Sequence, residues 1–266
     1  MQGTAVLLML ALLGCSHNAE SSSPEDASAS SSERPPIHYD QTAVLMVDGQ
    51  AQEEKAYRSL LDACKKSGMP THELTQDEVG KIGRLHVEAW IGPDTQAKHT
   101  EEWHQNAGSP CQFTLIHKDQ TEIIDAQGRS TLIDAATHKA EVQELGAPTP
   151  VTPLPAGDGN MDDAAKQAGW SKLSDASANG AACSIWQNAQ GLQLCVWKGG
   201  AKWGYSSYGV DALKDGMSQD SSIVLWSRPG KGAAWSLETR VFTVGQPLDQ
   251  SAFKVPDGVA VSAASP

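Results

Sequence analysis

The chain has 266 residues, of which 39% are hydrophobic, and a formal net charge of −12 at pH 7. This length is enough for one sizeable hydrophobic core or two small ones. The excess of acidic residues argues against nucleic acids and anionic lipid surfaces as partners, because both repel a negatively charged protein.

The first fourteen residues carry the pattern of an export signal. They read MQGTAVLLMLALLG, with an apolar run from Ala5 to Leu13. The run has the length of a signal-peptide core and is too short to cross a bilayer, which takes about 20 residues. The following sequence, Leu12-Leu13-Gly14-Cys15, resembles the lipobox of bacterial lipoproteins. That resemblance implies cleavage before Cys15, lipidation of its thiol and a membrane anchor. An ordinary signal peptide with an incidental cysteine is the alternative.

Two neighbouring features bear on this interpretation. Ser16, rather than an aspartate, follows the cysteine, and by the same resemblance this implies delivery to the outer membrane, facing the periplasm. No Lys or Arg precedes the apolar run, although a signal peptide normally begins with a positive segment. We therefore expect the true start of translation to lie upstream.

Beyond the signal, composition divides the chain into a tether and a body. Residues 15–36 are rich in serine and poor in apolar side chains, so we expect a disordered tether. Residues 37–266 are expected to form a single globular domain with 19 basic and 28 acidic residues, a net charge of −9. The segment 146–160 contains four prolines. We interpret it as a long internal loop, with a domain linker as the alternative.

Four cysteines remain in the body, and an even number in an exported chain is typical of disulfides. Cys183 and Cys195 flank a turn-rich stretch, and a hairpin centred on Ala189 would place them directly opposite each other. That pairing leaves Cys64 with Cys111. The spacing fits neither a zinc site nor a redox motif, because there is no C-x-x-C.

Helix signals are few and short. Residues 52–66 place Tyr57, Leu60, Leu61 and Cys64 on one face, ahead of Gly68. Thr75-Gln-Asp-Glu78 has the form of a capping box and predicts a helix over 75–82. Residues 160–168 are a third candidate.

The remainder of the body alternates in the manner of short strands separated by turns. Strands are predicted at 43–47, 84–91, 113–117, 121–125, 131–134, 183–186, 192–198, 202–208, 222–226 and 236–243. The fold class is therefore α+β and mostly antiparallel β, a curved open sheet with two or three short helices.

The second half resembles a known group of exported proteins of unknown function. Gly180-Ala-Ala-Cys183-Ser-Ile-Trp186 is followed by Cys195-Val-Trp-Lys198-Gly199, and Phe253-Lys-Val-Pro-Asp-Gly258 comes near the end. In that group a G-x-x-C-x-x-[WY] strand precedes a C-[VI]-[YW]-K-G strand. The resemblance implies an architecture similar to LolA-like lipoprotein carriers, a half-barrel whose concave face is covered by helices. It implies no catalytic residues.

Motifs for chemistry are weak. His99 and His104 lie five apart, which on a helix would point them about 140° from each other, and H-E-x-x-H and G-x-S-x-G are missing. Asp158-Gly-Asn-Met-Asp162-Asp163 lacks the downstream glutamate of a calcium loop. We interpret the histidines as surface residues and expect no catalytic residue, no metal and no cofactor.

Eight tryptophans are the most unusual part of the composition. Core packing around the predicted hairpin is one interpretation. The alternative is an aromatic wall for an apolar or glycan ligand, formed by Trp186, Trp197, Trp203, Tyr205 and Trp226.

Two functions remain open on the sequence. The first is a non-enzymatic lipoprotein that binds a lipidic or hydrophobic ligand. The second is an inhibitor or immunity lipoprotein that neutralises a toxic periplasmic enzyme, since an acidic inhibitor is attracted to a basic partner.

Overall fold

The computed structural model describes residues 34–144, 165–200, 203, 205 and 222–263. Cys15, most of the predicted tether and the Pro-rich segment 146–160 lie outside these residues, as does most of the predicted helix 160–168. The described residues fall within one compact unit, Ser32–Pro266. In this part of the chain no helix has the length and apolar character needed to span a membrane.

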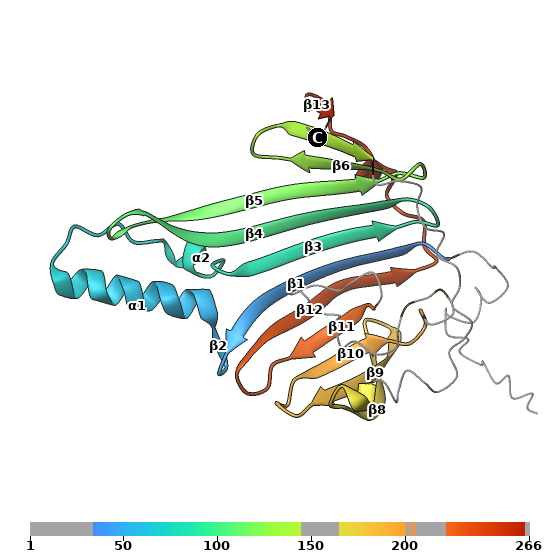
Figure 1. Ribbon diagram of the computed structural model, residues 1–266, viewed down its shortest axis with the longest axis horizontal. Helices are drawn as coiled ribbons and strands as arrows, with labels where there is room; N and C mark the ends of the chain where they lie inside the picture. Colours follow the sequence, from blue (N-terminus) through green and yellow to red (C-terminus); the bar gives the residue numbers. More distant parts are fainter. Residues whose placement is uncertain (1–33, 145–164, 201–202, 204, 206–221, 264–266) are drawn as a thin grey trace, which may run out of the picture. The chain divides into compact units, whose positions relative to one another are not determined.

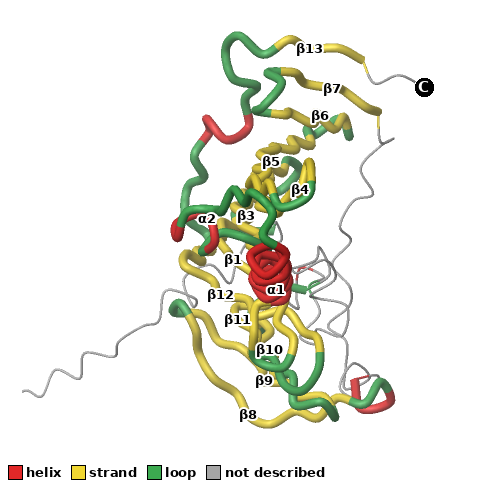
Figure 2. Tube along the Cα trace, turned by 90° about the vertical axis from the view of Figure 1, so that its left-hand side faces the viewer, coloured by secondary structure: helices red, strands yellow, loops and turns green. Residues whose placement is uncertain are grey.

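The fold is one open, mostly antiparallel sheet of thirteen strands, ordered β13-β7-β6-β5-β4-β3-β1-β12-β11-β10-β9-β8, with β2 beside β1 (Figure 1). Only β13 and β7 pair in parallel among the described strands. Figure 2 shows the strands succeeding one another in this order, with β13 and β8 at opposite ends. The predicted fold class, an open antiparallel sheet with a few short helices, is confirmed. The strands are β1 (Ile37–Val47), β2 (Gln50–Ala51), β3 (Arg84–Ile91), β4 (Gln96–Ser109), β5 (Gln112–Ile124), β6 (Arg129–Asp134), β7 (Lys139–Glu144), β8 (Trp170–Ala178), β9 (Ala181–Asn188), β10 (Gln193–Trp197), β11 (Val224–Arg228), β12 (Ala233–Val244) and β13 (Ala260–Ala263).

Strand β1 joins the two halves of the sheet. It pairs with β3 on one side and with β12 on the other, so that Ile37 lies opposite both Ile91 and Val244. From Ile37 to Val44 its residues alternate between buried and half-buried, with Ile37, Tyr39 and Ala43 in the main hydrophobic core. The core therefore lies on one face of the sheet around β1, and the opposite face of β1 and β3 carries polar side chains.

Helices α1 and α2 lie where the sequence predicts them. Helix α1 (Gln52–Ser67) ends at Gly68, whose φ of 70° is the left-handed conformation that glycine adopts readily. Helix α2 (Gln76–Val79) begins with the predicted capping box of Thr75 and Glu78, but it is a single turn rather than a helix to 82. A 3-10 turn, η4 (Gln250–Phe253), follows β12.

Both predicted disulfides are present. Cys64 of α1 is bonded to Cys111 at the β4–β5 turn, and the bond lies in a small core with Tyr57, Val79 and Phe113. Cys183 is bonded to Cys195, with their Cα atoms 5.4 Å apart.

The β9–β10 hairpin, which carries Cys183 and Cys195, is centred on Gln190 and not on Ala189 as predicted. Cys183 pairs with Trp197 and Cys195 pairs with Ile185, so the cysteines are diagonal neighbours rather than directly opposite. Asn188 explains the shift, because its side chain accepts hydrogen bonds from the amides of Gln190 and Leu192. The resulting three-residue loop closes with Gly191 at a φ of 85°.

The largest departures from the predicted strands are β4 and β5. Strand β4 has 14 residues where the sequence predicts no strand, because its segment QAKHTEEWHQNAGS has few strand-favouring side chains. Strand β5 runs unbroken through Asp119-Gln120, where a turn is predicted. Strands β7, β8 and β13 are also additions to the predicted set. Trp203 and Tyr205 of the predicted strand 202–208 belong to a turn around Gly200 instead.

Candidate functional site

Four of the eight histidines lie on one face of the sheet, one on each of four adjacent strands: His38 on β1, His86 on β3, His99 on β4 and His117 on β5. The registers place Glu101 directly between His86 of β3 and Asp119 of β5. We call this surface the histidine face. It comprises His38, Asp40, His86, Glu88, Trp90, His99, Glu101, Trp103, His117 and Asp119.

A chain of polar contacts crosses the histidine face. His86 Nε2 lies 2.9 Å from Asp40 Oδ1, and His86 Nδ1 lies 2.7 Å from Glu101 Oε2. The second oxygen of Glu101 lies 3.0 Å from His117 Nε2. Four strands are thus connected through side chains, and His86 in the middle is only 15% exposed.

A β-bulge extends this chain onto a further strand. The register between β1 and β12 shifts where Asp40 faces Val241 and Gln41 faces Thr239, so Arg240 is the extra residue. Bulges redirect the side chain of the extra residue. Here the Arg240 guanidinium donates to Asp40 Oδ1 at 3.0 Å and also lies 3.0 Å from His86 Nε2.

Two further ion pairs flank the central chain. His99 Nε2 lies 2.8 Å from Asp119 Oδ1, and His38 Nε2 lies 2.8 Å from Glu88 Oε1. Indoles fix two of the imidazole rings by stacking: Trp103 against His117 with centroids 4.9 Å apart, and Trp90 against His38 at 5.3 Å.

The electrostatics of Glu101 reflect its position. Burial raises the pKa of its carboxyl group, but hydrogen bonds from His86 and His117 favour the carboxylate and hold the pKa below its ordinary value. The carboxylate therefore stays ionised at neutral pH.

The histidine face lies between two apolar clusters. Along β5, Phe113 packs with α1 and α2 near one end, and Ile123 packs under the C-terminal segment that contains Phe253 at the other. His117 and Asp119 lie between these points on the same side of the strand. Neither cluster includes a residue of the histidine face except Trp90, which packs against the second cluster.

The predicted aromatic wall is largely core. Trp197 contacts Trp203, Tyr205 and Phe242, and all four rings are buried. Trp186 is fully buried on the opposite face of the β9–β10 hairpin, as alternation predicts, since it pairs with Leu194 whereas Trp197 pairs with Cys183. Trp226 is only partly buried and packs against the same hydrophobic core, with the Arg228 guanidinium 4.5 Å above its ring. The five residues therefore do not share one open wall.

The two histidines singled out by spacing are not brought together. His99 and His104 lie on opposite sides of β4, and His104 contacts Glu53 and Glu102. The signal that finds the histidine face is instead a spacing of two: His99-Thr-Glu101 and His117-Lys-Asp119. In a strand, residues two apart share a face, but this pattern is hidden when β4 is not recognised as a strand and Asp119 is placed in a turn.

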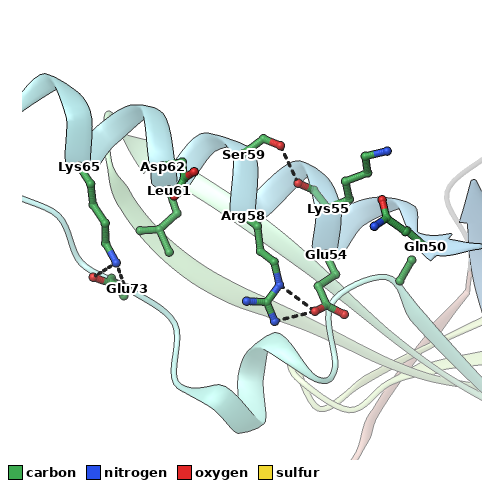
Figure 3. Close-up of a pocket in the computed structure, with 10 residues that line it drawn as sticks. Gln50, Glu54, Lys55, Arg58, Ser59, Leu61, Asp62, Lys65 and Glu73 are labelled. Carbon is green, nitrogen blue, oxygen red and sulfur yellow. Dashed lines mark hydrogen bonds and ion pairs between the residues drawn. The ribbon is translucent and has the colours of Figure 1, made fainter.

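A shallow groove beneath α1 is a second candidate. Figure 3 shows Arg58 and Glu54 side by side below the helix, and Lys65 reaching Glu73 on the segment that follows it. The two ion pairs have distances of 2.7 and 2.8 Å. Their partners are largely solvent-exposed, so the groove is an ordinary charged surface.

Comparison with known proteins finds little. No protein-family profile matches the chain, and no curated protein matches it. An uncharacterized conserved protein from Thermus thermophilus is similar in structure, with 7% sequence identity, coverage of 88% of this chain and 93% of that chain, and a TM-score of 0.37.

Proposed function

We propose that this chain is a lipid-anchored protein of the outer membrane that faces the periplasm and acts by binding a protein partner, without catalysis. The observation that carries the proposal is the filled aromatic core of the C-terminal half. Trp197 is 1% exposed and its neighbours are aromatic rings rather than open space. We therefore place the binding surface on an exposed face of the sheet.

Other features support the anchor and the compartment. The Leu12-Leu13-Gly14-Cys15 sequence resembles a lipobox, and the Ser-rich segment after it has the composition of a flexible tether. Two disulfides are typical of an oxidising compartment such as the periplasm.

The histidine face supports a protein partner. It offers Trp90 and Trp103, four imidazoles and four carboxylates on a partly exposed surface. Aromatic side chains are enriched at protein interfaces. The net charge of −9 on residues 37–266 favours a basic partner, whose association would be fast at low salt and slower as salt screens the charges. A toxic periplasmic enzyme neutralised by inhibition fits this description.

One observation favours the second candidate, a lipidic or hydrophobic ligand. The indole N–H of Trp197 is buried and has no hydrogen-bond partner among the described residues. A buried unpaired donor is costly, and a ligand with an acceptor group would satisfy it. The resemblance to LolA-like carriers points the same way.

Native mass spectrometry of residues 16–266, purified from the periplasm of a host given no added lipid, separates the two candidates. A clean mass with both disulfides intact and no uptake on lipid titration supports a protein partner. A co-purifying lipid of defined mass would overturn that proposal in favour of the carrier.

The anchor is tested separately on the full chain. Cys15→Ala should move the protein from the membrane fraction to the soluble fraction and remove incorporation of radiolabelled palmitate. Ser16→Ala is the matched control and should stay lipidated. Membrane association that survives Cys15→Ala would contradict the anchor.

A further inference from the structure

We propose that Glu101, His117 and Asp119, on strands β4 and β5 of the histidine face, ligate a divalent transition-metal ion. This inference goes beyond the proposed function and does not rest on it. The three residues come from two adjacent strands, β4 and β5, and their side chains project from the same face.

The ligand atoms are already grouped. One ligand atom from each of Glu101, His117 and Asp119 lies within 4.8 Å of the other two. Ligand atoms on a tetrahedral ion lie about 3.4 Å apart, given metal–ligand distances of about 2.1 Å. His117 Nε2 and Glu101 Oε1 are 3.0 Å apart, so an ion in place of the proton between them needs small side-chain rotations and no movement of the strands.

The positions of Glu101 and Asp119 in the sheet favour a cation bound between their carboxylates. Glu101 and Asp119 are directly opposite each other on adjacent strands, an arrangement in which like charges destabilise a sheet. A divalent cation between them replaces repulsion by attraction to both. No lysine or arginine occupies that position among the described residues, because the neighbouring Lys118 projects to the other side of β5, opposite Glu102.

The surrounding side chains match those that orient metal ligands. The Glu101 oxygen that does not face His117 is held by His86 Nδ1, and Nε2 of the same ring lies within hydrogen-bond distance of Asp40 and Arg240. Asp119 is held by His99, and the ring of His117 is held by Trp103. Hydrogen bonds from the residues that surround the metal ligands hold the ligands in position and contribute strongly to metal affinity.

The ligand set determines the class of metal. An imidazole nitrogen suits Zn²⁺, Ni²⁺, Cu²⁺ and Fe²⁺, whereas Ca²⁺ and Mg²⁺ prefer oxygen ligands throughout. Three protein ligands leave at least one coordination position for water or for a group from a partner. His117 is exposed, so that position faces solvent.

The test is calorimetric titration of the full-length chain, purified in detergent and freed of metal with a chelator, using Zn²⁺ itself as the probe. We expect one equivalent of Zn²⁺ to bind, with no competition from excess Mg²⁺. His117→Gln and Asp119→Asn should each weaken Zn²⁺ binding by at least about tenfold. Loss of a residue that only holds a ligand in place already costs about that much affinity, and these two residues are ligands themselves. His99→Gln, a positioning residue, should weaken binding while keeping the stoichiometry.

His38→Gln is the matched control. Like His117, His38 is paired with a carboxylate and stacked on an indole of the histidine face. Its partners are Glu88 and Trp90, and neither is one of the three proposed ligands. Its loss should leave Zn²⁺ affinity unchanged. Thermal unfolding of each variant reports whether it is folded. If His117→Gln does not fold, the conservative variant Asp119→Asn still tests the proposal.

A second measurement uses the indole stacked on His117. Paramagnetic Ni²⁺ at the site should quench Trp103 fluorescence, and Trp103→Phe should remove the metal-dependent part of the signal. Failure of the full chain to take up one equivalent of Zn²⁺ would overturn the proposal. Equal affinity in the unaltered chain, His117→Gln and Asp119→Asn would overturn it as well.

Discussion

The indole of Trp197 shows how closely the C-terminal core is packed around single residues. The ring is 1% exposed and lies against Trp203, Tyr205 and Phe242. The backbone also approaches it, because a Cβ atom at Gly200 would lie 2.7 Å from the indole ring. Glycine at this position is therefore a requirement of packing.

Trp197→Ala should lower the free energy of unfolding by about 3–5 kcal/mol, the usual cost of removing a large buried aromatic side chain. Trp226→Ala, a matched change at a half-buried ring, should cost less. Urea denaturation followed by circular dichroism measures both. An unchanged stability for Trp197→Ala would indicate that its ring lines a cavity rather than fills the core.

At the scale of residues, the core is more predictable from the sequence than the site. The Cys183–Cys195 pair, the opposite faces of Trp186 and Trp197, and the capping residues follow from local spacing, and the Cys64–Cys111 pair follows by elimination. The histidine face depends on which strand lies beside which, and no local pattern encodes that His86, Glu101 and Asp119 form one row across β3, β4 and β5. The predicted turn at Asp119 also separates it from His117, although the two share one face of an unbroken strand.

Among the elements, α2 owes its start to one reciprocal pair of hydrogen bonds. Thr75 Oγ1 accepts from the Glu78 amide, and the Glu78 carboxylate accepts from the Thr75 amide at 2.8 Å. The backbone hydrogen bond from Thr75, followed by the one from its hydroxyl, lowers the pKa of Glu78 below its ordinary value of 4.5. The capping box is thus strongest when Glu78 is ionised.

The sign of the pH dependence follows from that lowered pKa. A carboxyl group with a depressed pKa in the folded state contributes stability above its ordinary pKa and loses it as the pH falls through the folded value. Glu78→Gln should therefore reduce the loss of stability on acidification from pH 7 to about pH 3. Denaturation midpoints of both forms across this range measure the difference, and parallel curves would contradict it. Thr75→Ala should cost about 1 kcal/mol at neutral pH.

The two disulfides lie in different parts of the fold and should contribute unequally to the free energy of unfolding. Cys64–Cys111 closes a loop of 47 residues between α1 and the β4–β5 turn, whereas Cys183–Cys195 closes one of 12 within a hairpin. Loop entropy predicts losses of about 4 and about 3 kcal/mol when each pair is replaced by serine. Urea unfolding of the two double variants under oxidising conditions tests the order. A larger loss for Cys183→Ser/Cys195→Ser would show that packing, rather than loop length, dominates.

For the whole molecule, an open sheet has two edges, and β8 is the longer of them. Its backbone is paired only with β9 among the described strands, and Leu173 is 51% exposed in its middle. The register shift beside Leu173 and the charged side chains of Lys172 and Asp175 are features that discourage edge-to-edge association.

Leu173→Lys should raise the temperature at which the protein begins to aggregate, because an edge charge opposes pairing with a second molecule. The thermodynamic stability should change by no more than about 0.5 kcal/mol, as is usual for an exposed site. Light scattering on heating and urea denaturation measure the two quantities. Leu132→Lys, at an exposed leucine within β6 rather than on an edge, is the control and should leave aggregation unchanged.

The fold class is predictable from the sequence, but the order of the strands in the sheet is not. Periodicity defines β3 and the hairpins, since adjacent strands joined by short turns specify each other. The pairing of β1 with β12 joins residues far apart along the chain, as Ile37 opposite Val244 shows. Such a pairing is determined by the total burial that it achieves, and no property of either segment alone predicts it.

This long-range pairing constrains how the chain is made. As residues become available in order from the N-terminus during synthesis, β1 can pair with β3 early but has no neighbour on its other side until residues 233–244 arrive. Closing a loop of that length is slow compared with forming hairpins. For that interval the buried residues of β1 lie beside an unpaired backbone edge, the kind of intermediate that chaperones bind. The yield of native protein is then governed by the time between the appearance of its two central strands, β1 and β12.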